Sequence, residues 1–239
     1  MTNHELSEKV AVVTGASEGL GAALARELDR HGWALVLDAR DAARLEESVK
    51  GLARAHPTPG DVTDEGHRAA LVARAAELGG ASLLVNNAST LGASPQPTVA
   101  DLTPEVLEAV FRTNLQAPVE LVRGLLPQLR ASGGTVLNIS SDASVEGYPG
   151  WGAYGASKAA LDQVSRVLAA EEPGVRVYAV DPGDMRTRMH QDAFPGEDIS
   201  DRPPPESVVP HLVALLTSGL PSGRYRAADI AVPAGAAGR

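Results

Sequence analysis

The stretch KVAVVTGASEGLG, residues 9–21, places a short apolar run directly before a glycine-rich turn. KVAVVTG (9–15) is typical of a buried strand, because parallel strands covered on both faces are apolar along their whole length. The turn leads into GLGAALARELDRHG (19–32), whose apolar residues recur at helical spacing until Gly32. A strand, a glycine turn and a helix in this order predict the first βα unit of a parallel sheet.

The same alternation continues along the chain. We predict further strands at 33–37, 56–62, 82–88, 134–141, 174–183 and 223–230, and helices at 41–55, 65–78, from Pro104 onward, 152–171 and 205–217. The prolines of 56–62 limit that strand to a short one, and Pro118 is expected to bend or divide the long helix after Pro104. The pattern predicts an α/β fold with a doubly wound, Rossmann-like parallel sheet.

We expect one domain over residues 1–230, with no linker that would divide it. Residues 184–206 are rich in proline and lack periodicity, so we expect them to form a lid over the substrate. Residues 231–239 are expected to be a flexible tail. Ligands of such sheets bind beyond the carboxyl ends of the strands, which directs attention to the residues that follow each strand.

Composition narrows the classes of function. The 239 residues carry a formal net charge of -9, which argues against nucleic acid or an acidic membrane surface as a partner. With no cysteine, the chain has no disulfide, thiolate nucleophile or cysteine-based metal site, and no metal site is expected. The start, MTNHELSEK, has no signal-peptide core, and no apolar run is long enough to span a bilayer. We therefore expect a cytoplasmic protein.

The turn TGASEGLG (14–21) is suited to bind a diphosphate. Gly15 permits a tight turn, and Gly19 and Gly21 allow backbone and sheet to approach closely. The following helix offers unpaired N–H groups at its N-terminus. The predicted nucleotide contacts in this turn are Gly15, Ser17, Glu18, Gly19, Leu20 and Gly21.

The choice of dinucleotide depends on the residues after the second strand. An acidic residue there binds the ribose 2′-hydroxyl of NAD, whereas an arginine accepts the 2′-phosphate of NADP. The chain offers Asp38, Arg40 and Asp41 together. Asp38 favours NAD and Arg40 favours NADP, so the spacing alone leaves both open.

A second constellation lies in the C-terminal half. Tyr154 and Lys158 are four residues apart on a predicted helix, so they share a face. A nearby ammonium favours the phenolate and is expected to lower the tyrosine pKa, which suits proton exchange with a substrate oxygen. Ser140 and Ser141 end the preceding strand, and Asn114 lies in the long helix beside it.

These motifs resemble the short-chain dehydrogenase/reductase family, of the short single-domain type. TGASEGLG is similar to its cofactor turn, VNNAS (85–89) to its N-N-A-G strand end and YGASK (154–158) to its Y-x-x-x-K motif. Ser141, thirteen residues before Tyr154, matches the catalytic serine, and VDPGDMRT (180–187) resembles the P-G stretch. The match is colinear from about residue 9 to 230.

The resemblance implies a role for each matching residue. Tyr154 would be the general acid/base, Lys158 would hold the nicotinamide ribose, and Ser141 would orient the carbonyl. Asn114 would anchor a water in a proton relay. Further cofactor contacts would come from Asp61, Val62, Asn86, Asn87, Ala88, Pro182, Gly183 and Thr187.

The resemblance also favours NADP(H), with NAD(H) possible. The position that usually selects NAD holds Ala39, and the next holds Arg40. Ser89 departs from the last glycine of N-N-A-G, and the usual glycine-rich C-terminal ending is missing. We expect a homodimer or homotetramer, with a dimer through helices 104–131 and 152–171 as the simpler case.

The substrate is expected to be a small carbonyl compound or secondary alcohol. Mostly apolar residues from three loops would contact it, namely Leu91, Val145, Tyr148, Trp151, Met185, Met189 and Phe194. The predicted function is an NADP(H)-dependent carbonyl reductase or alcohol dehydrogenase. A non-catalytic NADP-binding regulatory protein of the same fold is the alternative, and a non-redox lyase or epimerase is a third.

Overall fold

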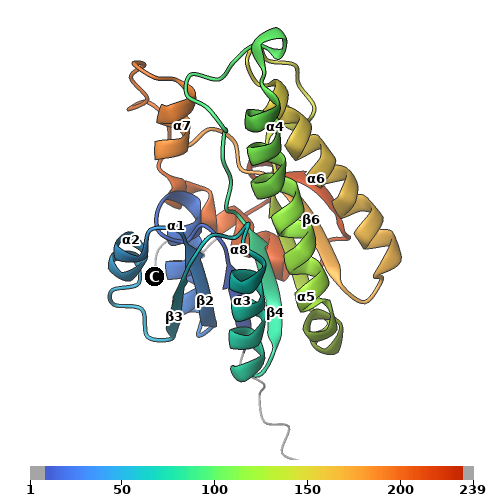
Figure 1. Cartoon of the computed structure of the whole chain (residues 1–239). Coiled ribbons are helices and arrows are strands. Elements are labelled where there is room, and N and C mark those ends of the chain that lie inside the picture. The colour runs from blue at the N-terminus through green and yellow to red at the C-terminus, as the bar shows by residue number, and fades with distance from the viewer. Residues whose placement is uncertain (1–8, 234–239) are drawn as a thin grey trace, which may run out of the picture.

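The computed structural model describes residues 9–233 and contains one seven-stranded sheet in the order β3-β2-β1-β4-β5-β6-β7 (Figure 1). Every strand pair is parallel. The predicted doubly wound fold is therefore confirmed. The strands are β1 (Val10–Val13), β2 (Ala34–Ala39), β3 (Ala55–Pro59), β4 (Ala81–Asn86), β5 (Thr135–Ile139), β6 (Arg176–Asp181) and β7 (Gly223–Arg226).

Helices cover both faces of this sheet. One face carries α1 (Gly19–Arg30), α2 (Ala42–Ser48) and α8 (Val209–Ser218). The other carries α3 (Glu65–Glu77), α5 (Ala117–Ser132) and α6 (Gly152–Glu171), with α4 (Pro104–Phe111) packed on α6. A short helix, α7 (Arg188–Ala193), stands apart from the sheet at the top left of Figure 1.

The two helical layers bury alternate residues of the strands. In β1, Ala11 and Val13 face the layer of α1 and α8, whereas Val10 and Val12 face the layer of α3 and α5. All four side chains are fully buried. This two-sided burial explains why β1 has no polar residue. The glycine turn follows directly at the carboxyl end of this buried strand.

Several elements are shorter than the sequence predicts, most clearly the second helix and the last strand. The second helix ends at Ser48 rather than near residue 55, because the chain turns at Gly51, whose φ of +83° favours glycine. The last strand ends at Arg226, where a 3₁₀ turn over Ala227–Asp229 begins. The strand in 56–62 is short, as expected, and lies at the sheet edge, where prolines are tolerated.

The long helix is divided near Pro118, as predicted, and the division is a π-helical turn. A π-helical turn over Arg112–Gln116 separates α4 from α5. Pro118 has no N–H to donate to the carbonyl of Asn114, so the α-helical ladder is interrupted there. Asn114 lies within this turn and is fully buried. The interruption therefore places the asparagine beside the loop after β4.

Only residues 231–233 of the expected tail fall within the described part of the chain, and 234–239 lie outside it. Within residues 9–233, no helix has both the length and the apolar character needed to cross a bilayer.

Candidate active site

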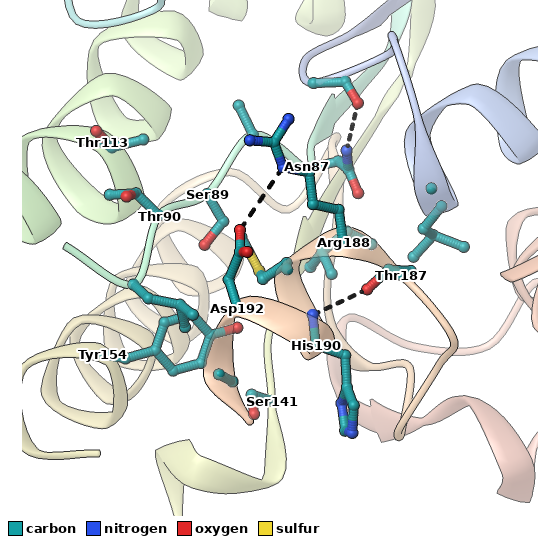
Figure 2. A pocket seen from close by; sticks show the side chains of 18 of the residues that line it. Asn87, Ser89, Thr90, Thr113, Ser141, Tyr154, Thr187, Arg188, His190 and Asp192 are labelled. Carbon is teal, nitrogen blue, oxygen red and sulfur yellow. Dashed lines mark hydrogen bonds and ion pairs between the residues drawn. The ribbon is translucent and has the colours of Figure 1, made fainter. Parts of the chain in front are cut away.

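A cavity of about 1110 Å³ opens at the carboxyl edge of the sheet. Its lining combines the glycine turn, the residues after β2, β4, β5 and β6, and the segment around α7. Figure 2 shows Tyr154 and Ser89 on one side of this pocket and Thr187 and His190 on the other. The cavity therefore joins the predicted nucleotide turn to the predicted catalytic residues.

The glycine turn is held tightly against the end of β4. Gly15 and Gly19 have φ values of +65° and +58°, in the left-handed region that favours glycine. The Asn87 amide donates to the carbonyl oxygens of Thr14 and Gly15 at 2.9 and 3.1 Å. Gly15, Ser17, Glu18, Gly19 and Leu20 line the cavity, whereas Gly21 is not part of its lining.

Gly21 has no room for a side chain. A Cβ at this position would lie 2.3 Å from the Gly15 carbonyl oxygen and 2.6 Å from the Asn87 amide nitrogen. We expect Gly21→Ala to displace the turn and to weaken dinucleotide binding at least tenfold, or about 1.4 kcal/mol. Titration of cofactor fluorescence measures the change. The matched control is Gly174→Ala, where an added Cβ meets no atom within 4 Å and the backbone is not left-handed, so binding should be unchanged. Unchanged binding by Gly21→Ala would contradict the expectation.

In the part of the cavity near the end of β2, Arg40 is exposed and Asp38 is buried. The Asp38 carboxylate is turned toward His67 of α3, with 2.6 Å between Oδ1 and Nε2. Burial raises the Asp38 pKa, and the hydrogen bond and charge of His67 oppose that rise. Asp61 and Val62 also line the cavity.

Of the three predicted residues after β4, two reach the cavity. Asn87 and Ala88 line it, whereas Asn86 does not. The Asn86 amide donates instead to the side chain of Asn138 on β5, at 2.7 Å within the core. Asn86 is therefore positioned to join two strands rather than to contact a nucleotide.

The catalytic helix brings Tyr154 and Lys158 to the cavity. Both side chains are buried, both line the pocket, and the Lys158 Nζ lies 5.5 Å from the centre of the Tyr154 ring. The Lys158 ammonium donates to the Ile139 carbonyl at 2.7 Å. Ser141, at the end of β5, hydrogen-bonds the Tyr154 phenol. The predicted serine, tyrosine and lysine are thus assembled around one point.

The ionisation of this pair differs from the expectation. Burial raises the pKa of Tyr154 to about 12, although hydrogen bonds with Ser89 and Ser141 oppose the shift. Burial lowers the pKa of Lys158 to about 8, against the charge of Asp162. The expected lowering of the phenol pKa is therefore wrong for this state, because the loss of water around the ring outweighs the neighbouring groups.

Asn114 lies behind the cavity rather than in its lining. Its Oδ1 accepts from the Ser89 hydroxyl at 3.1 Å and the Thr90 amide at 2.9 Å. Its Nδ2 donates to the Thr90 carbonyl and the Ser157 hydroxyl, both at 3.0 Å. The side chain is saturated by protein groups, so it acts on the site by fixing the loop after β4.

The segment after β6 forms another wall of the cavity. Pro182, Gly183 and Thr187 all line the cavity. Gly183 has a φ of +74°, and its amide donates to the Asp181 carboxylate at 2.9 Å. The Thr187 hydroxyl accepts from the His190 amide and caps α7, a contact marked in Figure 2.

Four of the seven residues expected to contact substrate line the cavity: Leu91, Trp151, Met185 and Met189. The other three do not: Val145, Tyr148 and Phe194. Phe194 packs behind Trp151, whose ring lies edge-on to Tyr154 with centroids 5.4 Å apart. The surface next to the phenol is therefore largely apolar.

Sequence reasoning assigned no role to three residues that the structure connects to the site. Ser89 bonds both Asn114 and Tyr154, and its departure from glycine was the signal that could have revealed it. His67 holds Asp38. Arg224 of β7 donates to Asp162 at 2.9 Å and to the Ser141 carbonyl at 3.0 Å, which ties the catalytic loop to the catalytic helix.

Comparisons with known proteins agree with this geometry. A family model described as short chain dehydrogenase matches residues 9–198. The short chain dehydrogenase penD of Penicillium thymicola is 35% identical over 82% of this chain and 77% of its own length. Sepiapterin reductase of Xenopus laevis is 36% identical over 78% of this chain and 77% of its own.

A solved short chain dehydrogenase of Shigella flexneri 2a, complexed with NADP, has a TM-score of 0.85 and 27% identity. The similarity covers 93% of this chain and 98% of that one. Since the family model spans most of the sheet and both motif regions, the chain belongs to the short-chain dehydrogenase/reductase family and is an oxidoreductase.

Proposed function

We propose that this protein is an NADP(H)-dependent carbonyl reductase, with a secondary alcohol as the product. The observation that carries the proposal is the convergence of Ser141, Tyr154 and Lys158 on a cavity that also contains the glycine turn. The Shigella relative bound to NADP has the same fold, which supports the choice of cofactor. The residues present fit such a cofactor, because the turn and Arg40 offer amides and a cation to its phosphates.

NADPH, when bound, would supply the hydride to the carbonyl carbon. The Tyr154 phenol would donate its proton to the carbonyl oxygen, and the Ser141 hydroxyl would hold that oxygen. A pKa near 12 keeps the phenol protonated at neutral pH, so it is ready to act as an acid. The buried Lys158 would hold the nicotinamide ribose and return a proton to the phenolate, and Asn114 would fix the loop after β4 beside the site.

The segment 184–206 would act as a lid over the substrate. Thr187 lies against the glycine turn, since a Cβ at Gly19 would meet its methyl carbon at 3.5 Å. The Ser94 hydroxyl donates to the Asp192 carbonyl at 2.6 Å, which links the loop after β4 to α7. We further propose one domain over 1–230, a cytoplasmic location and a homodimer or homotetramer through α4, α5 and α6.

The substrate proposal is tested by following the absorbance of the reduced nicotinamide across a panel of ketones, aldehydes and secondary alcohols. Apolar ketones are expected to be reduced fastest, because Leu91, Trp151 and Met189 line the pocket beside the phenol. A protein that binds NADPH and turns over no member of the panel would favour the non-catalytic alternative.

The cofactor proposal is tested at Arg40. This side chain is exposed in the cavity lining, close enough to Asp61 for the two charges to attract. We expect Arg40→Ala to weaken NADPH binding at least tenfold, since a charged hydrogen bond contributes about 1.5–3 kcal/mol. NADH binding should change less than about twofold.

Fluorescence titration with both cofactors measures the two affinities. The matched control is Arg123→Ala, which removes an exposed arginine from α5, outside the cavity lining. Equal binding of NADPH and NADH by the parent protein would contradict the proposed preference.

A further inference from the structure

A second serine hydroxyl lies beside the Tyr154 phenol. The phenol forms hydrogen bonds with Ser141, which follows β5, and with Ser89, which lies in the loop after β4. Both serines line the cavity, and Figure 2 shows the phenol between them. Ser89 stands in place of the last glycine of the N-N-A-G motif, so the usual set of serine, tyrosine and lysine does not include this hydroxyl.

The Ser89 hydroxyl is also in contact with the buried Asn114. It donates to the Asn114 Oδ1 at 3.1 Å, and the same oxygen accepts from the Thr90 backbone amide at 2.9 Å. The Asn114 Nδ2 donates to the Thr90 carbonyl and to the Ser157 hydroxyl, both at 3.0 Å. Asn114 therefore keeps a hydrogen bond at each end of its side chain even when Ser89 turns its proton elsewhere.

The Ser141 hydroxyl has other partners for its single proton. In the structure it donates to the Asp142 carboxylate at 3.0 Å, and in the proposed function it would hold the carbonyl oxygen of the substrate. Once the phenol has given up its proton, Tyr154 carries a negative charge in a buried place, where a charge is costly without a hydrogen-bond donor. Ser89 is the neighbouring hydroxyl whose proton is able to turn toward that charge.

We propose that Ser89 is a further catalytic residue, whose hydroxyl turns from Asn114 to donate to the Tyr154 oxygen as the phenol passes its proton to the substrate carbonyl. The phenol O–H bond breaks, and the new O–H bond forms on the carbonyl oxygen. The O–H bond of Ser89 stays intact and changes only its acceptor. A donor placed where charge develops lowers the barrier. This inference rests on the proposed carbonyl reduction.

Ser89→Ala and Ser89→Gly test the proposal together, because both remove the hydroxyl but differ in side-chain volume and backbone freedom. We expect kcat for carbonyl reduction to fall at least tenfold in both variants, since a hydrogen bond to a charged group is lost. NADPH affinity should stay within about twofold of the parent. The solvent deuterium isotope effect on kcat should rise, because protonation of the carbonyl then makes up more of the barrier.

The matched control is Ser165→Ala. The Ser165 hydroxyl also contacts an asparagine side chain, since it accepts from the Asn138 amide at 2.8 Å. Ser165 lies on α6, outside the cavity lining. Its substitution leaves a buried amide without this partner, so it should lower the temperature of thermal unfolding while kcat is retained.

A kcat close to that of the parent in either folded Ser89 variant would overturn the proposal, because the hydroxyl would then not be needed. A parallel loss of NADPH binding would also overturn it and assign Ser89 to the shape of the cofactor site. So would an unchanged isotope effect. Failure of the proposed function is seen separately, as full activity in Tyr154→Phe.

Discussion

Tyr154→Phe is expected to lose between a hundredfold and ten-thousandfold of carbonyl reduction, the range that general acid catalysis contributes. The phenol is buried beside Ser89 and Ser141, and its pKa of about 12 keeps it protonated. Phenylalanine keeps the ring and its edge contact with Trp151 but has no proton to give. Steady-state turnover gives the loss, and NADPH titration should show nearly unchanged binding.

The matched control is Tyr225→Phe. Its hydroxyl donates to the Pro221 carbonyl at 2.8 Å, and the residue lies on β7 outside the cavity lining. This substitution removes the same hydroxyl group from a tyrosine outside the cavity, so turnover should be retained. Full activity in Tyr154→Phe would exclude the phenol as the acid, and a parallel loss of NADPH binding would assign it to cofactor binding.

The backbone of this site could be predicted because its signals are local. VAVV is apolar throughout since helices cover both sides of β1, and the glycines that follow have positive φ or no space for a Cβ. Strand, turn and helix are therefore encoded in adjacent residues. The same holds for the four-residue spacing that places Tyr154 and Lys158 on one face of α6.

The direction of the side chains was less predictable. Asp38 and His67 are 29 residues apart, and nothing local to either indicates the other. Asn86 matches the N-N-A-G motif, yet its side-chain amide donates a hydrogen bond to Asn138 on the neighbouring strand. The ionisation of Tyr154 depends on how completely distant segments exclude water from the ring. Such properties depend on tertiary packing, and the spacing of residues in the sequence gives no information about it.

Lys158→Met is expected to abolish most reduction while raising the stability of the fold at pH 7. The ammonium is buried, and burial lowers its pKa from 10.5 to about 8. That shift corresponds to a cost of up to about 3 kcal/mol for the buried charge, from which the lost hydrogen bond to Ile139 must be subtracted. Methionine fills similar space without charge. Turnover and urea unfolding measure the two effects.

The pH dependence identifies the buried charge as the cause. Below pH 8 the lysine is protonated in both the folded and the unfolded chain, so its unfavourable contribution is constant. Between pH 8 and 10.5 the unfolded chain binds more protons than the folded one, and the parent gains stability as pH rises. Lys158→Met lacks this gain, so its advantage over the parent should shrink from pH 7 to pH 10.

Lys158→Arg provides the contrasting variant. A guanidinium is planar, larger and effectively never deprotonated, so it keeps the buried charge at every pH of the experiment. It should lose activity like Lys158→Met but also lose stability, and it should show no recovery at pH 10. If both variants instead matched the parent in stability at pH 7 and 10, Lys158 would be a solvated side chain. That result would contradict the proposed role of Lys158, which depends on an ammonium buried next to the buried Tyr154 phenol.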